Sequence, residues 1–144
     1  MNGISVKVYS KAVDGSTALS KNFRVREFAC SDGADAVFVS PELVGLLQQL
    51  RDWAGASVQI SSAYRTAAHN RKVGGATRSQ HQYGTAADIT VSGKTPLEVA
   101  AYAEKLLGNR GGIGLYRSFC HVDVRQKRCR WDCRSGKQTV VSGF

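Results

Sequence analysis

The sequence predicts an α+β domain in which a small antiparallel sheet is flanked by helices. Short apolar or alternating segments typical of strands are mixed with longer segments that have the three- and four-residue apolar spacing of helices. The links between the last strands have hairpin length, which favours antiparallel pairing. The chain has 144 residues, 42% hydrophobic and 22% charged, as expected for one globular domain. We therefore expect residues 1–144 to form a single domain.

The N-terminal region is predicted to begin with a strand. Residues 4–9 alternate between apolar and polar side chains, which indicates a half-buried strand, and residues 14–17 have the composition of a turn. Three apolar residues of the next segment are expected in the core: Phe23, Val25 and Phe28.

Three helices are indicated by their end signals. Ser40 and Pro41 begin the first helix, whose leucines repeat at helical spacing until Gly55 ends it. Thr66 is expected to cap a short second helix. A capping box begins the third helix, over residues 96–107.

The other elements are predicted as strands. Residues 86–91 form a short, mostly apolar run that indicates a buried strand carrying Asp88. Further strands are expected at residues 57–61, around Ile113, at residues 120–124 and, as a last edge, at residues 139–141.

A histidine and an aspartate seven residues apart mark the candidate site. Between His81 and Asp88 lie Gly84 and two alanines, small residues that let the backbone turn tightly and bring the two side chains to one point. Two ligands hold a metal poorly, and His121 is the expected third. Two histidines and one aspartate would bind zinc and leave a fourth position for water, as in catalytic sites.

These motifs resemble the signature of the zinc D-Ala-D-Ala carboxypeptidase family, peptidase family M15, and its phage endolysin branch, which shares a fold with the hedgehog signalling domain. The matching positions extend from Phe23 to Trp131 and include segments 61–66, 68–76 and 112–116. The resemblance implies a hedgehog/DD-peptidase-like zinc peptidase that cleaves peptidoglycan stem peptides. Its core pattern here is Ser79-x-His81-x-x-Gly84-x-Ala86-x-Asp88, followed by His121-Val122-Asp123.

Arg65 is the predicted catalytic helper. It ends a strand beside the motif loop, where a fixed cation can hold a peptide carboxylate or stabilise a developing oxyanion. Ser79 and Tyr83 complete the predicted substrate-binding residues. Tyr83 and Tyr116 are expected either to line the cleft or to be buried aromatics.

The positions that carry the general base in many family members are occupied by other residues in this sequence. Many members carry a Glu three residues before the last zinc-binding histidine, or a His two before it, and here Ser118 and Phe119 occupy these positions. Asp123 lies two residues after His121 and resembles the His-x-Asp version of smaller phage and bacterial members. We expect Asp123 to help deprotonate a zinc-activated water; the alternative is that it orients a ligand.

His69 is expected to be structural, and neither a catalytic cysteine nor a four-cysteine metal site is expected. His69 lies outside the ligand motif, on the short second helix. Strand alternation would place Cys120 on the face opposite His121, which argues against a catalytic thiol. The four cysteines permit three disulfide pairings, and reduced thiols are expected because residues 1–5 lack a signal-peptide pattern.

The formal charge of +9 implies an anionic partner. Residues 125–137 are rich in cations and are expected near the mouth of the cleft. A solvated basic face is the first interpretation of this stretch, attraction to an anionic cell-wall polymer the second, and nucleic acid, which we do not expect, the last.

The sequence therefore predicts a single-domain, monomeric zinc peptidase acting on peptidoglycan stem peptides, with phage endolysin as the preferred assignment. D-Ala-D-Ala carboxypeptidase and L-Ala-D-Glu endopeptidase activities both remain open. A non-catalytic zinc-stabilised domain that binds cell wall or another partner is the alternative. No apolar run approaches the roughly 20 residues of a membrane span. We expect synthesis in the cytoplasm and action at the bacterial cell wall after phage-mediated release.

Overall fold

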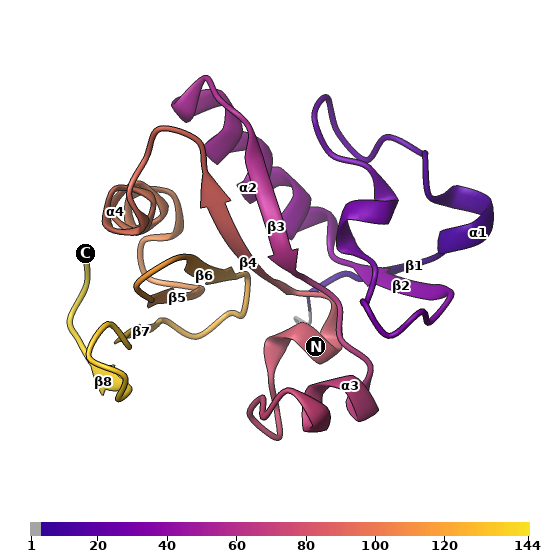
Figure 1. The fold of residues 1–144 in the computed structure, drawn as a ribbon. Coiled ribbons are helices and arrows are strands. Elements are labelled where there is room, and N and C mark those ends of the chain that lie inside the picture. The colour runs from indigo at the N-terminus through magenta and orange to yellow at the C-terminus, as the bar shows by residue number, and fades with distance from the viewer. Residues whose placement is uncertain (1–3) are drawn as a thin grey trace.

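A computed structural model, which describes residues 4–144, has the predicted α+β architecture (Figure 1). A six-stranded sheet forms its centre, and a separate two-stranded sheet lies to one side. In chain order the elements are β1 (Lys7–Ser10), α1 (Lys11–Asp14), η1 (Val25–Phe28), β2 (Ala36–Val39), α2 (Pro41–Ala54), β3 (Val58–Ser62), α3 (Ala67–Lys72), η2 (Gln80–Tyr83), β4 (Ala86–Val91), α4 (Pro96–Leu107), β5 (Gly112–Leu115), β6 (Cys120–Asp123), β7 (Cys129–Asp132) and β8 (Thr139–Val140).

The strand order of the large sheet is β3-β4-β6-β5-β7-β8. Neighbouring strands are antiparallel except β5 and β7, which are parallel. The sequence had suggested an antiparallel sheet. The sheet is antiparallel except for this one pair. After β6 the chain crosses to the far side of β5, where β7 pairs with it. Because β5 is antiparallel to β6, β7 runs parallel to β5 and antiparallel to β6.

The two long helices have the predicted bounds and caps. Ser40 Oγ accepts a hydrogen bond from the backbone N–H of Glu42 at the start of α2, and Gly55 ends that helix with a φ of 60°. At α4, Thr95 and Glu98 form the expected capping box. Both helices contact β4, and they contact one another, so they cover one face of the sheet.

Strand alternation divides the sheet into a core face and an open face. On the core face Ile89, Ile113, Leu115, Cys120 and Val122 are fully buried in one apolar cluster with the leucines of α2. The intervening residues of β4 and β6 point to the other face, because side chains alternate along a strand. These are the residues that carry the candidate chemistry: Asp88, His121 and Asp123.

Several elements differ from the sequence-based expectation. The first strand begins at Lys7 rather than residue 4, and it pairs with β2, an apolar run that the sequence analysis did not assign. β7 was also not predicted, because its residues were interpreted as part of a basic surface stretch. The short helix η2 occupies what was expected to be a loop.

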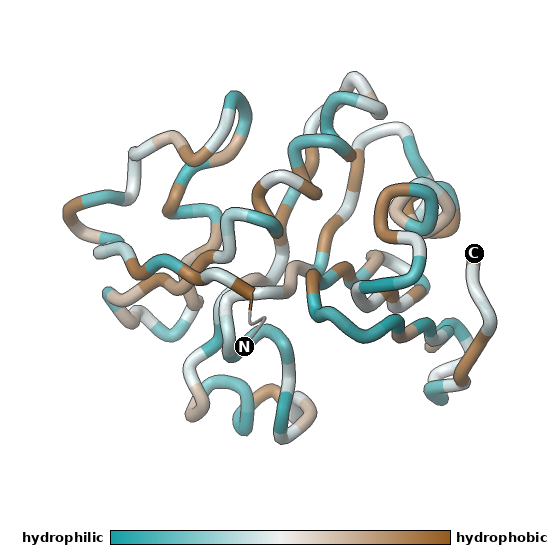
Figure 2. Tube along the Cα trace, turned by 180° about the vertical axis from the view of Figure 1, so that it is seen from behind, coloured by the Kyte–Doolittle hydropathy of each residue, from teal (hydrophilic) through white to brown (hydrophobic). Residues whose placement is uncertain are grey.

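The hydropathy of the chain follows this layering. Figure 2 shows the long helices with alternating hydrophobic and hydrophilic stretches, as expected for helices with one buried face, and a largely hydrophilic segment after β6. Within residues 4–144, none of the helices has the length and apolar character that crossing a bilayer requires.

Candidate metal centre

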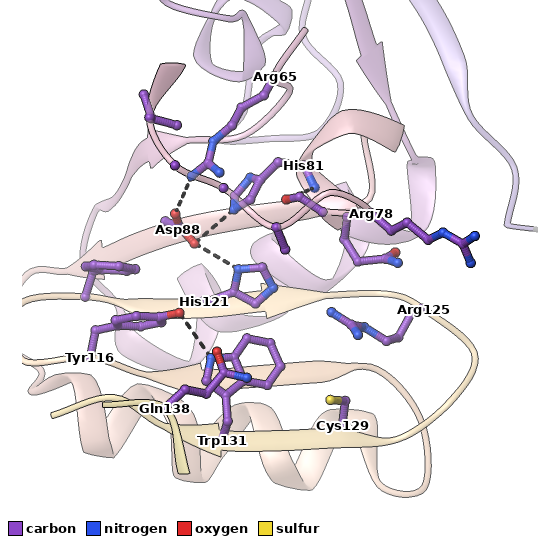
Figure 3. Close-up of a pocket in the computed structure, with 17 residues that line it drawn as sticks. Arg65, Arg78, His81, Asp88, Tyr116, His121, Arg125, Cys129, Trp131 and Gln138 are labelled. Carbon is purple, nitrogen blue, oxygen red and sulfur yellow. Dashed lines mark hydrogen bonds and ion pairs between the residues drawn. The ribbon is translucent and has the colours of Figure 1, made fainter. Parts of the chain in front are cut away.

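Three elements bring His81, Asp88 and His121 together on the open face of the sheet (Figure 3). Asp88 on β4 and His121 on β6 are directly paired in the antiparallel register. His81 comes from η2, which Ser79 caps by accepting a hydrogen bond from the His81 N–H. One donor atom from each of the three side chains lies within 4.8 Å of the others.

The turn after η2 needs a glycine. Gly84 has a φ of 74°, and a Cβ at this position would lie 2.4 Å from the carbonyl oxygen of Phe38. Only glycine combines this backbone conformation with such a close approach. Gly84 therefore sets how His81 is presented to β4, which is the role that the spacing between His81 and Asp88 had indicated.

In each histidine, the ring nitrogen that points away from Asp88 (the outer nitrogen) already has a hydrogen-bond partner. His81 Nδ1 lies 2.7 Å from the carbonyl oxygen of Ala63, and His121 Nε2 lies 2.8 Å from Asp123 Oδ2. A carbonyl and a carboxylate can only accept, so these two nitrogens carry the protons. His81 Nε2 and His121 Nδ1 are left facing Asp88 Oδ1, at 3.2 and 2.9 Å.

This donor set fits a zinc ion. Two imidazole nitrogens and one carboxylate oxygen are typical zinc ligands, and hydrogen bonds to the outer nitrogens fix ring orientation and tautomer, as they do at metal sites. Burial raises the pKa of Asp88, but hydrogen bonds from His121 and His81 outweigh burial and hold the pKa well below its usual range. Asp88 is therefore ionised, as a ligand must be.

The pKa of His121 also reflects this cluster. Burial lowers it, but the hydrogen bonds to Asp123 and Asp88 raise it to about 9. The second imidazole proton, on His121 Nδ1 and directed at Asp88 Oδ1, takes the position that a metal ion would need. Metal binding must therefore displace that proton.

Asp123 lies behind His121 and is fully buried. Its Oδ1 accepts hydrogen bonds from the Gly112 N–H at 2.9 Å and from Arg125 Nε at 2.8 Å, and its Oδ2 accepts from Arg125 Nη2 at 2.7 Å as well as from His121. Burial raises the pKa of Asp123, yet the hydrogen bonds from His121 and Arg125 keep it below its ordinary value. The general-base role expected for Asp123 does not fit a carboxylate that is enclosed and does not line the cavity. Its geometry favours the alternative, orienting His121.

Two glycines of β5 make room for this arrangement. A Cβ on Gly112 would lie 2.2 Å from Asp123 Oδ2, and a Cβ on Gly114 would lie 2.4 Å from the Trp131 ring. These glycines have no unusual backbone conformation, so the close approach of neighbouring side chains is their reason. The Gly112-Ile113-Gly114 segment thus leaves room for Asp123 and Trp131, which contact the candidate ligand His121.

Arg65 lies where the sequence predicted, beside the ligands. Its Nη2 is 3.3 Å from Asp88 Oδ2, and its Nε donates to Ser62 Oγ at 3.0 Å. Its Nη1 donates to Oδ1 of Asn70, a buried side chain that sequence reasoning did not single out. A polar residue on a short helix gives no signal of burial by itself, and only the packing against the 73–78 loop reveals it.

An open cavity of about 510 Å³ lies in front of the three ligands. Arg65 and Ser79 are among its lining residues, as are Tyr116, Trp131 and Arg125. Tyr83, predicted to bind substrate, does not line it, and its side chain is 47% exposed. His69 also lies outside the cavity and has its Nε2 3.2 Å from Ser31 Oγ.

The basic stretch 125–137 is not one surface. Arg125 lines the cavity, but Arg130 is buried and, with Arg128, forms ion pairs with Glu104 of α4. Arg134 pairs with Asp132. This stretch was expected to lie as a whole near the mouth of the cleft. That expectation is wrong for Arg128 and Arg130, because both pair with Glu104. Strand alternation in β7 turns Arg130 to the core face.

A comparison with known protein families gives a match whose span includes this site. The family model described as Peptidase M15 matches residues 19–123, a span that contains the three candidate ligands, Arg65 and Asp123. No curated protein matches the chain significantly. The matched span covers most of the 144 residues, and the chain belongs to the M15 peptidase family.

Proposed function

We propose that this protein is a zinc-dependent peptidase that hydrolyses peptide bonds in peptidoglycan stem peptides, as a phage endolysin acting at the bacterial cell wall. The observation that carries the proposal is the convergence of His81 Nε2, Asp88 Oδ1 and His121 Nδ1 at an open cavity. Three protein ligands that face a cavity leave a coordination position for water or substrate, which distinguishes catalytic from structural zinc sites.

The metal would be held by His81, Asp88 and His121. When bound, zinc lowers the pKa of a water molecule to about 7 and polarises a carbonyl group, the chemistry that amide hydrolysis needs. The protein itself holds the ligands in place. Ala63 fixes the ring of His81, and Asp123 fixes that of His121.

Asp123 has an orienting role in this proposal. Its negative charge makes His121 a better electron donor at Nδ1, and Arg125 holds the carboxylate through two hydrogen bonds. The chain of contacts from ligand to carboxylate to guanidinium keeps the imidazole from rotating.

Arg65 is the candidate for stabilising charge that develops on the substrate. Three partners fix its guanidinium group, which lines the cavity beside Asp88. A fixed cation beside the scissile carbonyl stabilises an oxyanion without reorganisation during the reaction.

Digestion of purified peptidoglycan, with mass spectrometry of the released fragments, tests this proposal. Release of free D-alanine indicates a carboxypeptidase, and a new N-terminal glutamate indicates an L-Ala-D-Glu endopeptidase. We expect a chelator to abolish the release and added zinc to restore it. A protein that retains zinc and binds the polymer but releases no peptide would instead be a zinc-stabilised binding domain.

A further inference from the structure

The buried side chain of Asn70 joins two parts of the cavity wall. Asn70 is the one buried residue of α3, with 2% of its surface exposed, and it does not itself line the cavity. Its Oδ1 accepts a hydrogen bond from Arg65 Nη1 at 3.2 Å, and its Nδ2 donates to the carbonyl oxygen of Ala76 at 2.8 Å. One amide group therefore holds both the guanidinium group of Arg65 and residues 73–79, the loop between α3 and η2.

A side-chain amide suits these two partners. A guanidinium group can only donate and a carbonyl oxygen can only accept, so the group between them must offer one acceptor and one donor. This requirement also fixes the orientation of the amide, with its oxygen toward Arg65 and its nitrogen toward Ala76. A carboxylate in the same place would keep the acceptor and lose the donor, and an apolar side chain would lose both.

The loop packs closely against Asn70. The Gly75 N–H donates to the Asn70 backbone carbonyl at 2.9 Å, and a Cβ on Gly75 would overlap Asn70 Oδ1. The Ala76 carbonyl accepts a second hydrogen bond, from the Ser79 N–H at 3.0 Å, and Ser79 caps η2, the helix that carries His81. Gly75, Ala76 and Ser79 all line the cavity. The contacts of Asn70 therefore extend through the cavity wall to the helix of a candidate ligand.

We propose that Asn70 is a positioning residue, which fixes the guanidinium group of Arg65 beside the candidate ligands and fixes the loop 73–79 as one wall of the cavity. The inference rests on the proposed peptidase function, in which Arg65 stabilises charge on the substrate. The other guanidinium nitrogens of Arg65 bind Ser62 Oγ and Asp88 Oδ2, so its three partners come from β3, α3 and β4. Because Asn70 is uncharged, it holds the guanidinium without neutralising its charge, as a carboxylate there would.

Kinetics on a stem peptide test the link from Asn70 to Arg65. Asn70→Ala should lower kcat of the zinc-loaded enzyme about tenfold and change KM less than about threefold, because displacing an oxyanion donor has a smaller effect than the about 10²–10³-fold loss on removing one. Arg65→Gln should lower kcat about 10²-fold. In that background Asn70→Ala should lower kcat less than about twofold further, since Asn70 then has no guanidinium to position.

Thr66→Ala is the matched control for a general loosening of α3. Thr66 Oγ1 accepts a hydrogen bond from the His69 N–H at 3.1 Å and so caps the same helix, but none of the hydrogen bonds of the Arg65 guanidinium group involves it. Losing this cap should weaken the helix and leave kcat within about twofold of normal. The positioning role would be overturned if Thr66→Ala lowered kcat as much as Asn70→Ala, or if Asn70→Ala acted equally with and without Arg65.

NMR of the metal-free protein separates this inference from the proposed function, because the measurement needs no peptide cleavage. Nη1 and Nη2 of Arg65 bind different residues, so rotation about the Nε–Cζ bond should be slow and the two nitrogens should give separate signals, which Arg65→Gln identifies. Asn70→Ala should raise the rotation rate about tenfold, since it removes one hydrogen bond that rotation must break. An unchanged rate would reject the positioning role. If no peptide is cleaved, the peptidase proposal fails, and this measurement still decides the role of Asn70.

Asn70→Asp separates the two ends of the amide. It keeps an acceptor for Arg65 and lacks the N–H group that binds Ala76. Rotation of the guanidinium group should therefore stay slow, whereas hydrogen exchange at the Ser79 N–H, which shares the Ala76 carbonyl, should become about fivefold faster. Unchanged exchange at Ser79 would reject the link to the cavity wall, and rotation as fast as in Asn70→Ala would reject the link to Arg65.

Discussion

Two clusters of charge lie on opposite faces of the large sheet, one buried and one only partly buried, and they are satisfied in different ways. In the Glu104 cluster (Glu104, Arg128 and Arg130), both carboxylate oxygens accept hydrogen bonds from both arginines, and Arg130 also donates to the carbonyl oxygens of Gly108 and Gly111. In the metal-site cluster (His81, Asp88 and His121), three electron-pair donors converge on one point.

The difference separates a structural ion pair from a candidate binding site. The Glu104 cluster supplies an N–H group for every carboxylate oxygen, so it is complete without any added ion. The metal-site cluster is complete only when a proton or a cation lies between its donors. Charge and burial alone do not distinguish the two clusters, but the balance of donors and acceptors does.

The largest effect is expected from removing a metal ligand. His81→Ala should weaken zinc binding by more than the about 10–100-fold that loss of a supporting hydrogen bond typically costs, because tetrahedral zinc has few alternative ligands. Elemental analysis after dialysis against a competing chelator measures this. His69→Ala is the control and should retain zinc, since His69 lies outside the cavity. Full zinc content in His81→Ala would reject the assigned ligand set.

A substitution in the Glu104 cluster should lower the free energy of unfolding and leave metal binding unchanged. Breaking a buried ion pair costs about 3–5 kcal/mol, and partial exposure of Glu104 reduces our expectation for Glu104→Gln to about 2–4 kcal/mol. Urea unfolding of the metal-free protein measures this change. Asp132→Asn, which removes an exposed pair with Arg134, should cost less than about 1 kcal/mol.

The contribution of Glu104 to the stability of the fold should decrease at acidic pH. The hydrogen bonds from Arg130 and Arg128 lower the pKa of Glu104 from 4.5 to about 2. The stabilisation is therefore fully present above pH 4.5 and lost as the pH falls toward 2. If Glu104→Gln and the unmutated protein lost stability in parallel over this interval, Glu104 would not be the titrating group.

A smaller effect is expected for Asp123→Asn, and it distinguishes the two roles considered for this residue. If Asp123 orients His121, zinc affinity falls about 10–100-fold and excess zinc restores most of the activity. If Asp123 were the general base, activity would fall about 10²–10⁴-fold even with zinc saturated. Activity measured against zinc concentration separates these outcomes, and circular dichroism checks that the variant is folded.

The metal-binding affinity of the unmutated protein should itself depend on pH. The pKa of His121 is about 9 in the metal-free protein, so between pH 7 and 9 zinc must displace a proton from it. Zinc affinity should rise about tenfold per pH unit up to about pH 9 and then level off. Competition titrations at several pH values test this, and a flat profile would show that His121 is neutral before metal binds.

Local signals predicted much of the fold and the ligands of the site. The caps at Ser40 and Thr95 and the glycine at residue 55 involve contacts within a few residues, so the sequence determines both long helices almost completely. The three candidate ligands could be proposed from the sequence because the spacing between His81 and Asp88 and the later His121 match a known family pattern. The α+β class followed from the same short-range patterns.

The roles of the charged residues could be assigned only from the tertiary structure, because they depend on neighbours that are distant in the chain. Asp123 could be assigned to His121, and Arg130 to Glu104, only once β6, β7 and α4 were placed beside one another. Arg130 on β7 is buried beside α4, whereas Arg125, which precedes β7, binds Asp123 and lines the cavity. A charged residue carries the same local signal whether it faces solvent, an ion pair or a cavity. Its role is set by which oppositely charged groups the fold brings within hydrogen-bonding distance, and this information is not local in sequence.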